Sequence, residues 1–407
     1  MTYSSTLLRL LDERGYIHQC TDAAGLDALA GKQVVPGYIG FDATAPSLHV
    51  GNLVSIMLLR RLQQAGHRPV VLMGGGTTRI GDPTGKDEVR KMLTDDAIDA
   101  NVASIRTAFE KFLVFGDGPT DAVMVNNHDW LSQVGYIEML QKVGTHFTVN
   151  RMLSFDSVKL RLEREQPMTF LEFNYMILQG YDFRHLNLEL GVRLQMGGSD
   201  QWGNIVNGVE LTRRMDSVEV FGLTTPLITK ADGSKMGKSV SGAVWLNEAQ
   251  LPNYDYWQFW RNTDDRDVGK LLRLFTDLPL DEIAQLEALE GSELNQAKIV
   301  LANEATRLCR GEEAAQAAQA TAEATFTGGG LGADLPLLDL PADGISVIDA
   351  LVGIGFAASR GEAKRLIAGG GARLDGAAIT DESAQIAGGT EHRLSAGKKK
   401  HGIIRPA

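Results

Sequence analysis

Two polar side chains stand where the sequence predicts the first turn of a helix. His49 and Asn52 follow an extended apolar run and a loop of turn-forming residues in the stretch YIGFDATAPSLHVGNL, residues 38–53. Free backbone N–H groups and the helix dipole make a helix N-terminus favourable for phosphate. The pattern indicates a phosphate-binding turn, although any parallel α/β unit would present the same strand, loop and helix.

A second polar group lies within an apolar segment, FLEFNYMILQGYD, residues 170–182. On a helix, Tyr175, Gln179 and Asp182 are spaced i, i+4 and i+7, so they point the same way. Such side chains need hydrogen-bond partners when they are buried. Two interpretations remain open: a hydrogen-bond network inside the core, or a pocket for a polar ligand.

Two loops that contain glycine carry further candidate binding residues. In GGSDQWGN, residues 197–204, the glycines let the backbone approach a ligand closely. Asp200 and Gln201 in this loop supply acceptors and donors for sugar hydroxyls or a carboxylate. In ADGSKMGKS, residues 231–239, Lys235 and Lys238 lie three residues apart. By composition alone, the second loop is a mobile, exposed turn.

The segment GGGTTRIGDPTGK, residues 74–86, looks like two phosphate-binding motifs, and we reject both. A dinucleotide-binding G-x-G-x-x-G would need glycine where Arg79 stands. A phosphate loop would need glycine at Ile80 and serine or threonine at Asp87.

The elements that position these residues alternate between strand and helix. An amphipathic helix over 5–15 precedes a strand that ends near Phe41 and the helix that starts near His49. A second strand over 69–73 completes a strand, helix, strand order, which is the start of a parallel sheet. Further strands are predicted over 122–125, 194–196 and 226–229.

The last third of the chain changes in character. From residue 253 to about 325 it is helical and rich in Ala, Glu and Leu, with an aromatic stripe at its start that is more often core than a base-stacking platform. A Gly-Gly-Gly run and two prolines then indicate a linker. The predicted domains are 1–247, 248–326, a linker over 327–344, and 345–407.

Residues 345–407 carry more Lys and Arg than Asp and Glu, whereas the whole chain has a net charge of −11. A basic cluster there is a candidate phosphate-binding surface, although basic surface runs are common. The string SRGEAKRLIAGGGARLDG resembles an S4-type RNA-binding module, which is a helix pair against a sheet. The candidate RNA-binding residues are Arg360, Lys364, Arg365, Lys398 and Lys399.

Composition limits the possible classes of protein. With 407 residues and 43% hydrophobic content, the chain has room for two or three domains with a large core. The net charge of −11 argues against indiscriminate coating of nucleic acid. Cys20 and Cys309 form neither a disulfide framework nor a zinc ribbon. A reducing cytoplasm is the expected location, since no apolar run approaches the roughly 18 residues of a membrane span.

Taken together, these motifs resemble those of the bacterial tyrosyl-tRNA synthetases, a family of class I aminoacyl-tRNA synthetases, over essentially the whole chain. H-x-G-N after G-F-D-x-T is similar to a signature usually written H-x-G-H, and KMGKS is similar to K-M-S-K-S. Residues 74–84 resemble the family's G-G-x-T-x-x-I-G-D-P-[ST] stretch. The chain departs from the usual family residue at Ile39, Asn52, Thr78, Arg79 and His128.

The resemblance implies a pocket for tyrosine, and the residues give a physical argument for it. A phenol hydroxyl both donates and accepts a hydrogen bond, and Tyr38 and Asp182 would supply its two partners. The resemblance assigns the ammonium group to Asp82, Tyr175 and Gln179, and the carboxylate side to Gln195 and Gln201.

The resemblance also implies an ATP site. Thr44 and His49 would hold phosphates, and Asp200 would bind the ribose. Charge on the departing pyrophosphate would be stabilised by Lys86, Arg90, Lys235 and Lys238. Further nucleotide contacts are implied for Gly40, Asp42, Gly51, Asn52, Gly198 and Ser239, with Ser55 a weaker candidate and the usual ribose contact doubtful at Ile39.

The fold implied is α/β, a doubly wound, Rossmann-like parallel sheet followed by a helical anticodon-binding domain and a small α+β S4-like domain. The implied partners are L-tyrosine, ATP with Mg²⁺, tRNA(Tyr) and a second copy of the chain, with no membrane and no dedicated metal site. Three alternatives stay open: a tryptophanyl-type enzyme, a small nucleotidyltransferase, and a non-catalytic RNA-binding paralogue.

Overall fold

The structure is a computed structural model. It describes residues 2–83, 93–234, 236–239, 242–327, 335–341, 344–397 and 400–406. The chain divides into two compact units, Met1–Met236 with Gly269–Gln285, and Gly237–Val268 with Leu286–Ala407.

The first unit is built on a six-stranded sheet in the order β1-β6-β5-β2-β3-β4. The edge strand β1 runs antiparallel to β6, and the other neighbouring strands are parallel. The strands are β1 (Gln19–Cys20), β2 (Pro36–Phe41), β3 (Arg68–Met73), β4 (Val123–Asn126), β5 (Leu194–Gly198) and β6 (Phe221–Thr225).

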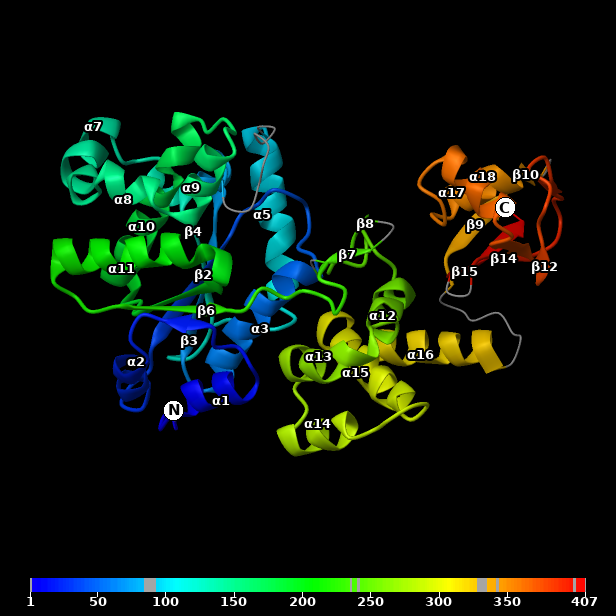
Figure 1. Cartoon of the computed structure of the whole chain (residues 1–407), viewed down its shortest axis with the longest axis horizontal. Helices are drawn as coiled ribbons and strands as arrows, with labels where there is room; N and C mark the ends of the chain where they lie inside the picture. The colour runs from blue at the N-terminus through cyan, green and yellow to red at the C-terminus, as the bar shows by residue number, and fades with distance from the viewer. Residues whose placement is uncertain are drawn as a thin grey trace. The chain divides into compact units, whose positions relative to one another are not determined.

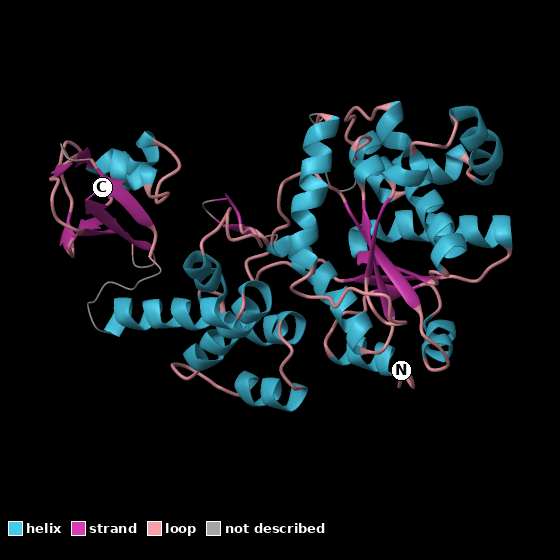
Figure 2. Cartoon of the chain, turned by 180° about the vertical axis from the view of Figure 1, so that it is seen from behind, coloured by secondary structure: helices cyan, strands magenta, loops and turns pink. Residues whose placement is uncertain are grey.

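Helices cover both faces of this sheet, with α3 and α5 on one side and α10 and α11 on the other (Figures 1 and 2). The chain order runs outward from β2 through β3 to β4, and in the opposite direction from β5 to β6, so the order reverses between β2 and β5. This confirms the predicted doubly wound fold, in which ligands bind at the carboxyl ends of the strands beside the reversal.

The helices of the first unit include several short ones. They are α1 (Thr6–Glu13), α2 (Ala23–Ala30), α3 (Val50–Gln64), α4 (Gly75–Thr78), α5 (Asp95–Phe109), α6 (His128–Leu131), α7 (Tyr136–Glu138), η1 (Met139–Val143), η2 (Gly144–His146), α8 (Val149–Leu153), α9 (Asp156–Glu163), α10 (Phe170–Leu190), η3 (Ser199–Gln201), α11 (Trp202–Asp216), α13 (Val268–Phe275) and α14 (Leu280–Glu287).

The long helix α10 has clear start and stop signals. The Thr169 hydroxyl accepts from the Glu172 N–H at 3.2 Å, and the Glu172 carboxylate accepts from the Thr169 N–H at 2.9 Å, a reciprocal capping box. The helix ends at Gly191, whose φ of 64° is in the left-handed region. Its buried side chains Phe183 and Leu186 pack in one cluster with Tyr38 of β2, which fixes the helix against the sheet.

One predicted strand was misplaced. The sequence suggested a strand over 226–229, whereas β6 ends at Thr225. Pro226 follows at once, and proline has no N–H to donate to a neighbouring strand.

The second unit contains a helical part and a small sheet. α12 (Asn253–Arg261), η4 (Asp265–Asp267), α15 (Leu294–Arg310) and α16 (Glu312–Thr327) form the helical part. Tyr256, Trp257 and Trp260 of α12 are buried, and the Trp257 Nε1–H donates to Asn303 Oδ1 at 2.7 Å. The aromatic stripe is therefore core, as its pattern predicted.

The small sheet has five strands in the order β12-β11-β14-β15-β9 and packs with α17 and α18 around its own apolar cluster. β9 lies in the segment predicted as a linker and pairs in parallel with β15. A separate strand pair is β10 with β13, and another is β7 with β8. The elements are β7 (Lys238–Ser239), β8 (Gly242–Ala243), β9 (Leu337–Leu340), β10 (Ile345–Ser346), α17 (Val347–Gly353), α18 (Arg360–Ala368), β11 (Ala372–Leu374), β12 (Ala377–Ala378), β13 (Gln385–Ile386), β14 (His392–Ala396) and β15 (Lys400–Pro406).

Candidate active site

A cavity of about 310 Å³ lies at the carboxyl ends of β2 and β5, where the strand order reverses. This volume is at the lower end of the usual range for small-ligand sites, about 300–1,000 Å³. All the side chains predicted to bind tyrosine line it: Tyr38, Asp82, Tyr175, Gln179, Asp182, Gln195 and Gln201. Several residues of the predicted nucleotide site also line the cavity: Thr44, His49, Gly40, Asp42, Asn52 and Gly198. Ile39 and Ser55 line it as well.

Two predicted nucleotide residues do not line the cavity in the described part of the chain. Gly51 lies in the first turn of α3, where a Cβ would come within 2.7 Å of the His49 ring. Its glycine is therefore needed for the histidine to fold back over the helix start. Asp200 is an exposed residue of η3, directly after β5.

Asp182 is almost completely buried, with a relative exposure of 1%. Its carboxylate accepts from Asn127 Nδ2 at 2.9 Å and from Trp130 Nε1 at 2.8 Å. Sequence reasoning missed both donors. The signal for them was the polar turn Asn126–Asn127–His128–Asp129, which follows β4 at the same edge of the sheet.

Burial raises the pKa of Asp182 to about 7, with a further upward contribution from Asp42, while the hydrogen bonds from Asn127 and Trp130 oppose the rise. Burial, and then the charge of Asp182, raise the pKa of Tyr38 well above 10. The Tyr38 phenol thus stays protonated at neutral pH. Its hydroxyl is buried and has no hydrogen-bond partner within the described residues.

The opposite side of the cavity presents amide and carboxyl groups. Asp82 Oδ2 accepts from Gln201 Nε2 at 2.9 Å, which joins two residues that the sequence places 119 positions apart. Gln195 is 2% exposed, and its Oε1 has no hydrogen-bond partner in the described ranges. A buried amide with unused capacity, on the wall of a cavity that also presents the carboxyl group of Asp82, suits a zwitterionic ligand.

The first turn of α3 orients His49. Its Nδ1 accepts from the Gly51 N–H at 3.0 Å, so the neutral ring carries its proton on Nε2. Asn52 Oδ1 accepts from the His49 N–H at 3.2 Å and completes a capping box. The departure at Asn52 from the usual second histidine therefore has a structural role at the helix start.

The Gly-rich segment after β3 packs against the end of β4. The N–H of Gly75 donates to Asn126 Oδ1 at 3.1 Å, and the N–H of Gly76 donates to Asn127 Oδ1 at 2.8 Å. A Cβ on Gly75 would lie 2.3 Å from Asn126 Oδ1, so the close approach requires glycine. Thr77 Oγ1 then donates to Asp42 Oδ1 at 3.1 Å, so this segment also orients the loop after β2.

Met236 of the second signature lies beside the first turn of α3. A Cβ added to Gly51 would lie 3.2 Å from the backbone oxygen of Met236. Lys235, Lys86 and Arg90 lie outside the described residues, as do Lys398 and Lys399. Lys238 and Ser239 form β7, but their side chains lie outside the description.

The predicted RNA-binding residues that the structure describes lie on α18. Arg360 is paired with Asp349, and Lys364 Nζ lies 3.1 Å from Glu382 Oε2. Arg365 is exposed, with no ion pair inside the described ranges. Two of these three cations are thus already paired with carboxylates.

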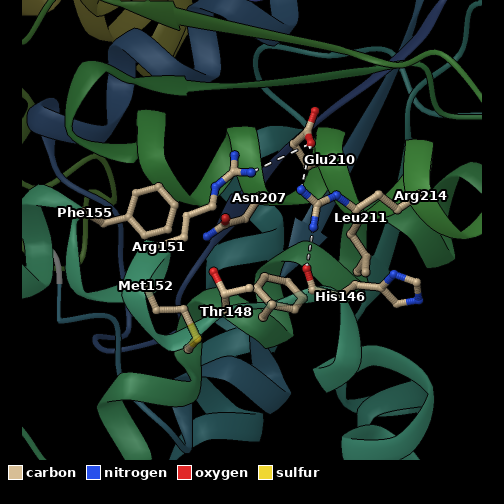
Figure 3. Close-up of a pocket in the computed structure, with 10 residues that line it drawn as sticks. His146, Thr148, Arg151, Met152, Phe155, Asn207, Glu210, Leu211 and Arg214 are labelled. Atoms are coloured by element: carbon tan, nitrogen blue, oxygen red, sulfur yellow. Dashed lines mark hydrogen bonds and ion pairs between the residues drawn. The ribbon is translucent and has the colours of Figure 1, made fainter.

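A second, much smaller cavity of about 10 Å³ lies between α8 and α11. Figure 3 shows Glu210 between Arg151 and Arg214, at 3.7 and 3.4 Å, and Arg214 donating to the His146 carbonyl at 2.9 Å. The space holds about one water molecule. These ion pairs fasten α8 and the preceding turn to α11, and the cavity is no candidate for a substrate site.

Comparison with known proteins agrees with this geometry. Residues 32–327 match the family described as tRNA synthetases class I (W and Y). A tyrosine–tRNA ligase of Novosphingobium aromaticivorans is 73% identical over 100% of this chain and 99% of its own, and one of Zymomonas mobilis is 63% identical over 99% of each. A C-terminally truncated mitochondrial tyrosyl-tRNA synthetase of Aspergillus nidulans superposes with a TM-score of 0.72 at 29% identity, over 79% of this chain and 95% of its own. The chain therefore belongs to the class I tRNA synthetases (W and Y).

Proposed function

We propose that this chain is a tyrosine–tRNA ligase, which activates L-tyrosine with ATP and transfers the tyrosyl group to tRNA(Tyr). The observation that carries the proposal is the buried pair on the cavity wall, where Tyr38 offers a donor and Asp182 an acceptor. A phenol hydroxyl satisfies both. Phenylalanine would leave the buried Tyr38 hydroxyl unpaired and would offer no donor to Asp182, and for tyrosyl-tRNA synthetases the discrimination against it is about 10⁵.

The same pair disfavours tryptophan as the substrate. An indole N–H only donates, so it would satisfy Asp182 and leave the buried Tyr38 hydroxyl without an acceptor. Full-length relatives at 56–73% identity are named tyrosine–tRNA ligase, which agrees with this choice.

In the first step, the tyrosine carboxylate attacks the α-phosphorus of ATP. A new C–O–P linkage forms, the bond to the bridging oxygen breaks, and pyrophosphate leaves with the electron pair. A carboxylate is already ionised at neutral pH, so no general base is needed. Catalysis then depends on positioning and on charge stabilisation. In the second step, a ribose hydroxyl of the tRNA attacks the activated carbonyl carbon. A new ester bond forms, the bond from that carbon to the adenylate oxygen breaks, AMP leaves with the electron pair, and the hydroxyl proton is released.

The family resemblance implies the following roles for residues that line the cavity. Asp82, Tyr175 and Gln179 would accept from the ammonium group, and Gln195 and Gln201 would face the carboxylate. His49 would donate its Nε2–H to a phosphate, because its Nδ1 is engaged with Gly51. Thr44, on the same wall, would bind a second phosphate oxygen.

The remaining nucleotide contacts are proposals from the family pattern. Lys86, Arg90, Lys235 and Lys238 would stabilise charge on pyrophosphate, and Asp200 would bind the ribose. Mg²⁺ would arrive on the ATP phosphates and neutralise part of their charge. The described residues contain no cluster of three His, Cys, Asp or Glu able to hold an ion.

The test of the function is exchange of labelled pyrophosphate into ATP. We expect exchange that depends on tyrosine, with tryptophan and phenylalanine at background, because only a phenol satisfies both Tyr38 and Asp182. No exchange with tyrosine, or equal exchange with tryptophan, would overturn the assignment.

We further propose that the chain works as a homodimer. The segment 136–171 exposes large apolar side chains, among them Ile137 at 64%, Tyr136 at 60% and Phe170 at 68%. Exposed apolar surface of this kind marks an interaction site.

For the dimer, the check is light scattering of Ile137→Asp and Phe170→Asp, with Leu188→Asp as control. Leu188 is 54% exposed and lies near the C-terminal end of α10, outside the segment 136–171. We expect the first two variants to be monomeric and the control dimeric. A monomeric parent chain, or dimers in every variant, would refute the proposal.

The C-terminal part is proposed to bind RNA. Residues 248–326 would read the anticodon, and residues 345–407 would contact tRNA phosphates through the cluster that includes Arg360, Lys364 and Arg365. A cytoplasmic location is also proposed, because a chain with only two cysteines, far apart in the sequence, suits a reducing compartment. Among the described helices, none has the length and apolar character needed to cross a membrane.

A further inference from the structure

The loop that joins β2 to α3 carries Thr44 and is held by side chains to which no role has been assigned so far. Thr78 of α4 contacts it from one side, and Asn101 and Ser104 of α5 contact it from the other. Thr78 is one of the positions at which the chain departs from the usual residue of its family, which is glycine.

The contacts converge on the peptide groups next to Thr44. The Ala43 N–H donates to Thr78 Oγ1 at 2.8 Å, and Asn101 Nδ2 donates to the Ala43 carbonyl at 2.9 Å. Ala43 is completely buried between them. Beyond Thr44, Ser104 Oγ donates to the Pro46 carbonyl at 2.5 Å. The backbone is thus fixed on both sides of Thr44.

The two helices that supply these side chains are tied together by Arg79, a second departure from the family pattern. Its Nε donates to Asp95 Oδ1 at 2.8 Å, its Nη2 lies 3.7 Å from Asp99 Oδ1, and its Nη1 donates to the Gly75 carbonyl at 2.6 Å. Asp95 and Asp99 belong to α5, and Gly75 belongs to α4. Arg79 therefore fixes the distance between Thr78 and Asn101.

We propose that Thr78, Asn101 and Ser104 are positioning residues that hold Thr44 in place for the ATP phosphates, and that Arg79 holds their helices in register. The inference rests on the proposed ATP-dependent activation of tyrosine. A displacement of about 1 Å at a reacting site costs about 100-fold in rate, so a loop that binds phosphate gains from such restraint. Among the described residues, the side chains that donate to Asp182 at the tyrosine end of the cavity are Asn127 and Trp130, neither of which belongs to this group.

The experiment compares Thr78→Val and Asn101→Ala in tyrosine-dependent pyrophosphate exchange. Each removes one hydrogen bond to Ala43. We expect a fall of about 10-fold in kcat/KM for ATP, with the dissociation constant of tyrosine, measured without ATP, unchanged within about twofold. Thr78→Ser keeps the hydroxyl and should restore the parent value.

Two matched controls remove similar groups elsewhere. Thr212→Val deletes a buried hydroxyl that donates to the Gly208 carbonyl at 2.9 Å within α11, and Arg106→Ala changes an exposed residue of α5 that pairs with Glu110 at 3.8 Å. Both should behave as the parent chain. Thermal unfolding of every variant shows whether the fold is intact.

Unchanged ATP kinetics in both Thr78→Val and Asn101→Ala would overturn the inference. So would an equal loss in tyrosine affinity, or a loss that Thr78→Ser does not restore, because these indicate general destabilisation. If the parent chain itself shows no exchange with tyrosine, the proposed function fails, and that outcome is distinct from a failure in the variants alone.

Discussion

Asp182→Asn should lower tyrosine-dependent pyrophosphate exchange by about 100-fold or more. The variant keeps the shape of the side chain but replaces one acceptor oxygen by an NH₂ group. Because Asn127 and Trp130 already point N–H donors at that position, one donor would face another, and the phenol would lose its charged acceptor. A lost hydrogen bond to a charged group is worth about 3 kcal/mol, which corresponds to about 100-fold.

The pH dependence of tyrosine binding, compared between the parent chain and Asp182→Asn, tests more specifically whether Asp182 accepts from the phenol. Burial raises the pKa of Asp182 to about 7, so the protonated form accumulates as the pH falls below that value. The ionised carboxylate is the stronger acceptor for a phenol, and binding therefore favours it. We expect the dissociation constant of tyrosine to rise as the pH is lowered from 8 to about 5.5 in the parent chain, and to stay flat in Asp182→Asn.

The matched control is Asp216→Asn. Asp216 is likewise a hydrogen-bonded carboxylate and accepts from Arg184 Nε at 2.6 Å, but it is the last residue of α11 and is not among the residues that line the cavity. It should leave exchange and its pH profile unchanged. Full activity in Asp182→Asn would show that the phenol is held elsewhere, and a pH profile shared by parent and variant would assign the titration to another group.

The sequence predicted the parts of this site that depend on local pattern. Helical spacing alone placed Tyr175, Gln179 and Asp182 on one face, and the strand, loop and helix around His49 followed from apolar runs and turn residues. The partners of Asp182 do not follow from any such pattern. Asn127 and Trp130 lie 55 and 52 residues before it, and they meet it only because β4 ends beside β3.

The structural roles of residues that depart from the family pattern could not be predicted from the sequence either. Asn52, Thr78 and Arg79 look like losses when they are compared with the usual residues. In the structure, Asn52 caps α3 and Thr78 bonds to Ala43. Arg79 joins α4 to α5. Each contact pairs a side chain with a backbone group or with a carboxylate distant in the sequence. A sequence motif contains no information about either kind of partner.

In the C-terminal segment, counting charges in the sequence does not show which basic side chains are paired with acidic ones. The basic run on α18 indicates a phosphate-binding face, but Arg360 and Lys364 each lie against a carboxylate, Asp349 and Glu382. Tertiary pairing with acidic residues at other positions in the sequence lowers the field that such a run presents. RNA would have to displace or tolerate these partners, so Arg360 and Lys364 attract phosphate less strongly than the charge count implies.

A chain that stops after Thr327 should lose tRNA charging by about 100-fold or more and keep pyrophosphate exchange within about twofold of the full chain. The cut removes β9 together with β15, its partner strand, so no edge strand of the small sheet is left behind. It leaves intact the cavity lined by Tyr38, Asp182 and His49, which all lie in the first unit. Loss of several phosphate contacts accounts for the size of the effect.

Exchange and charging are measured on the same preparation, so exchange is the internal control for folding of the first unit. Charging that survives the cut at full rate would show that tRNA is bound without the C-terminal segment.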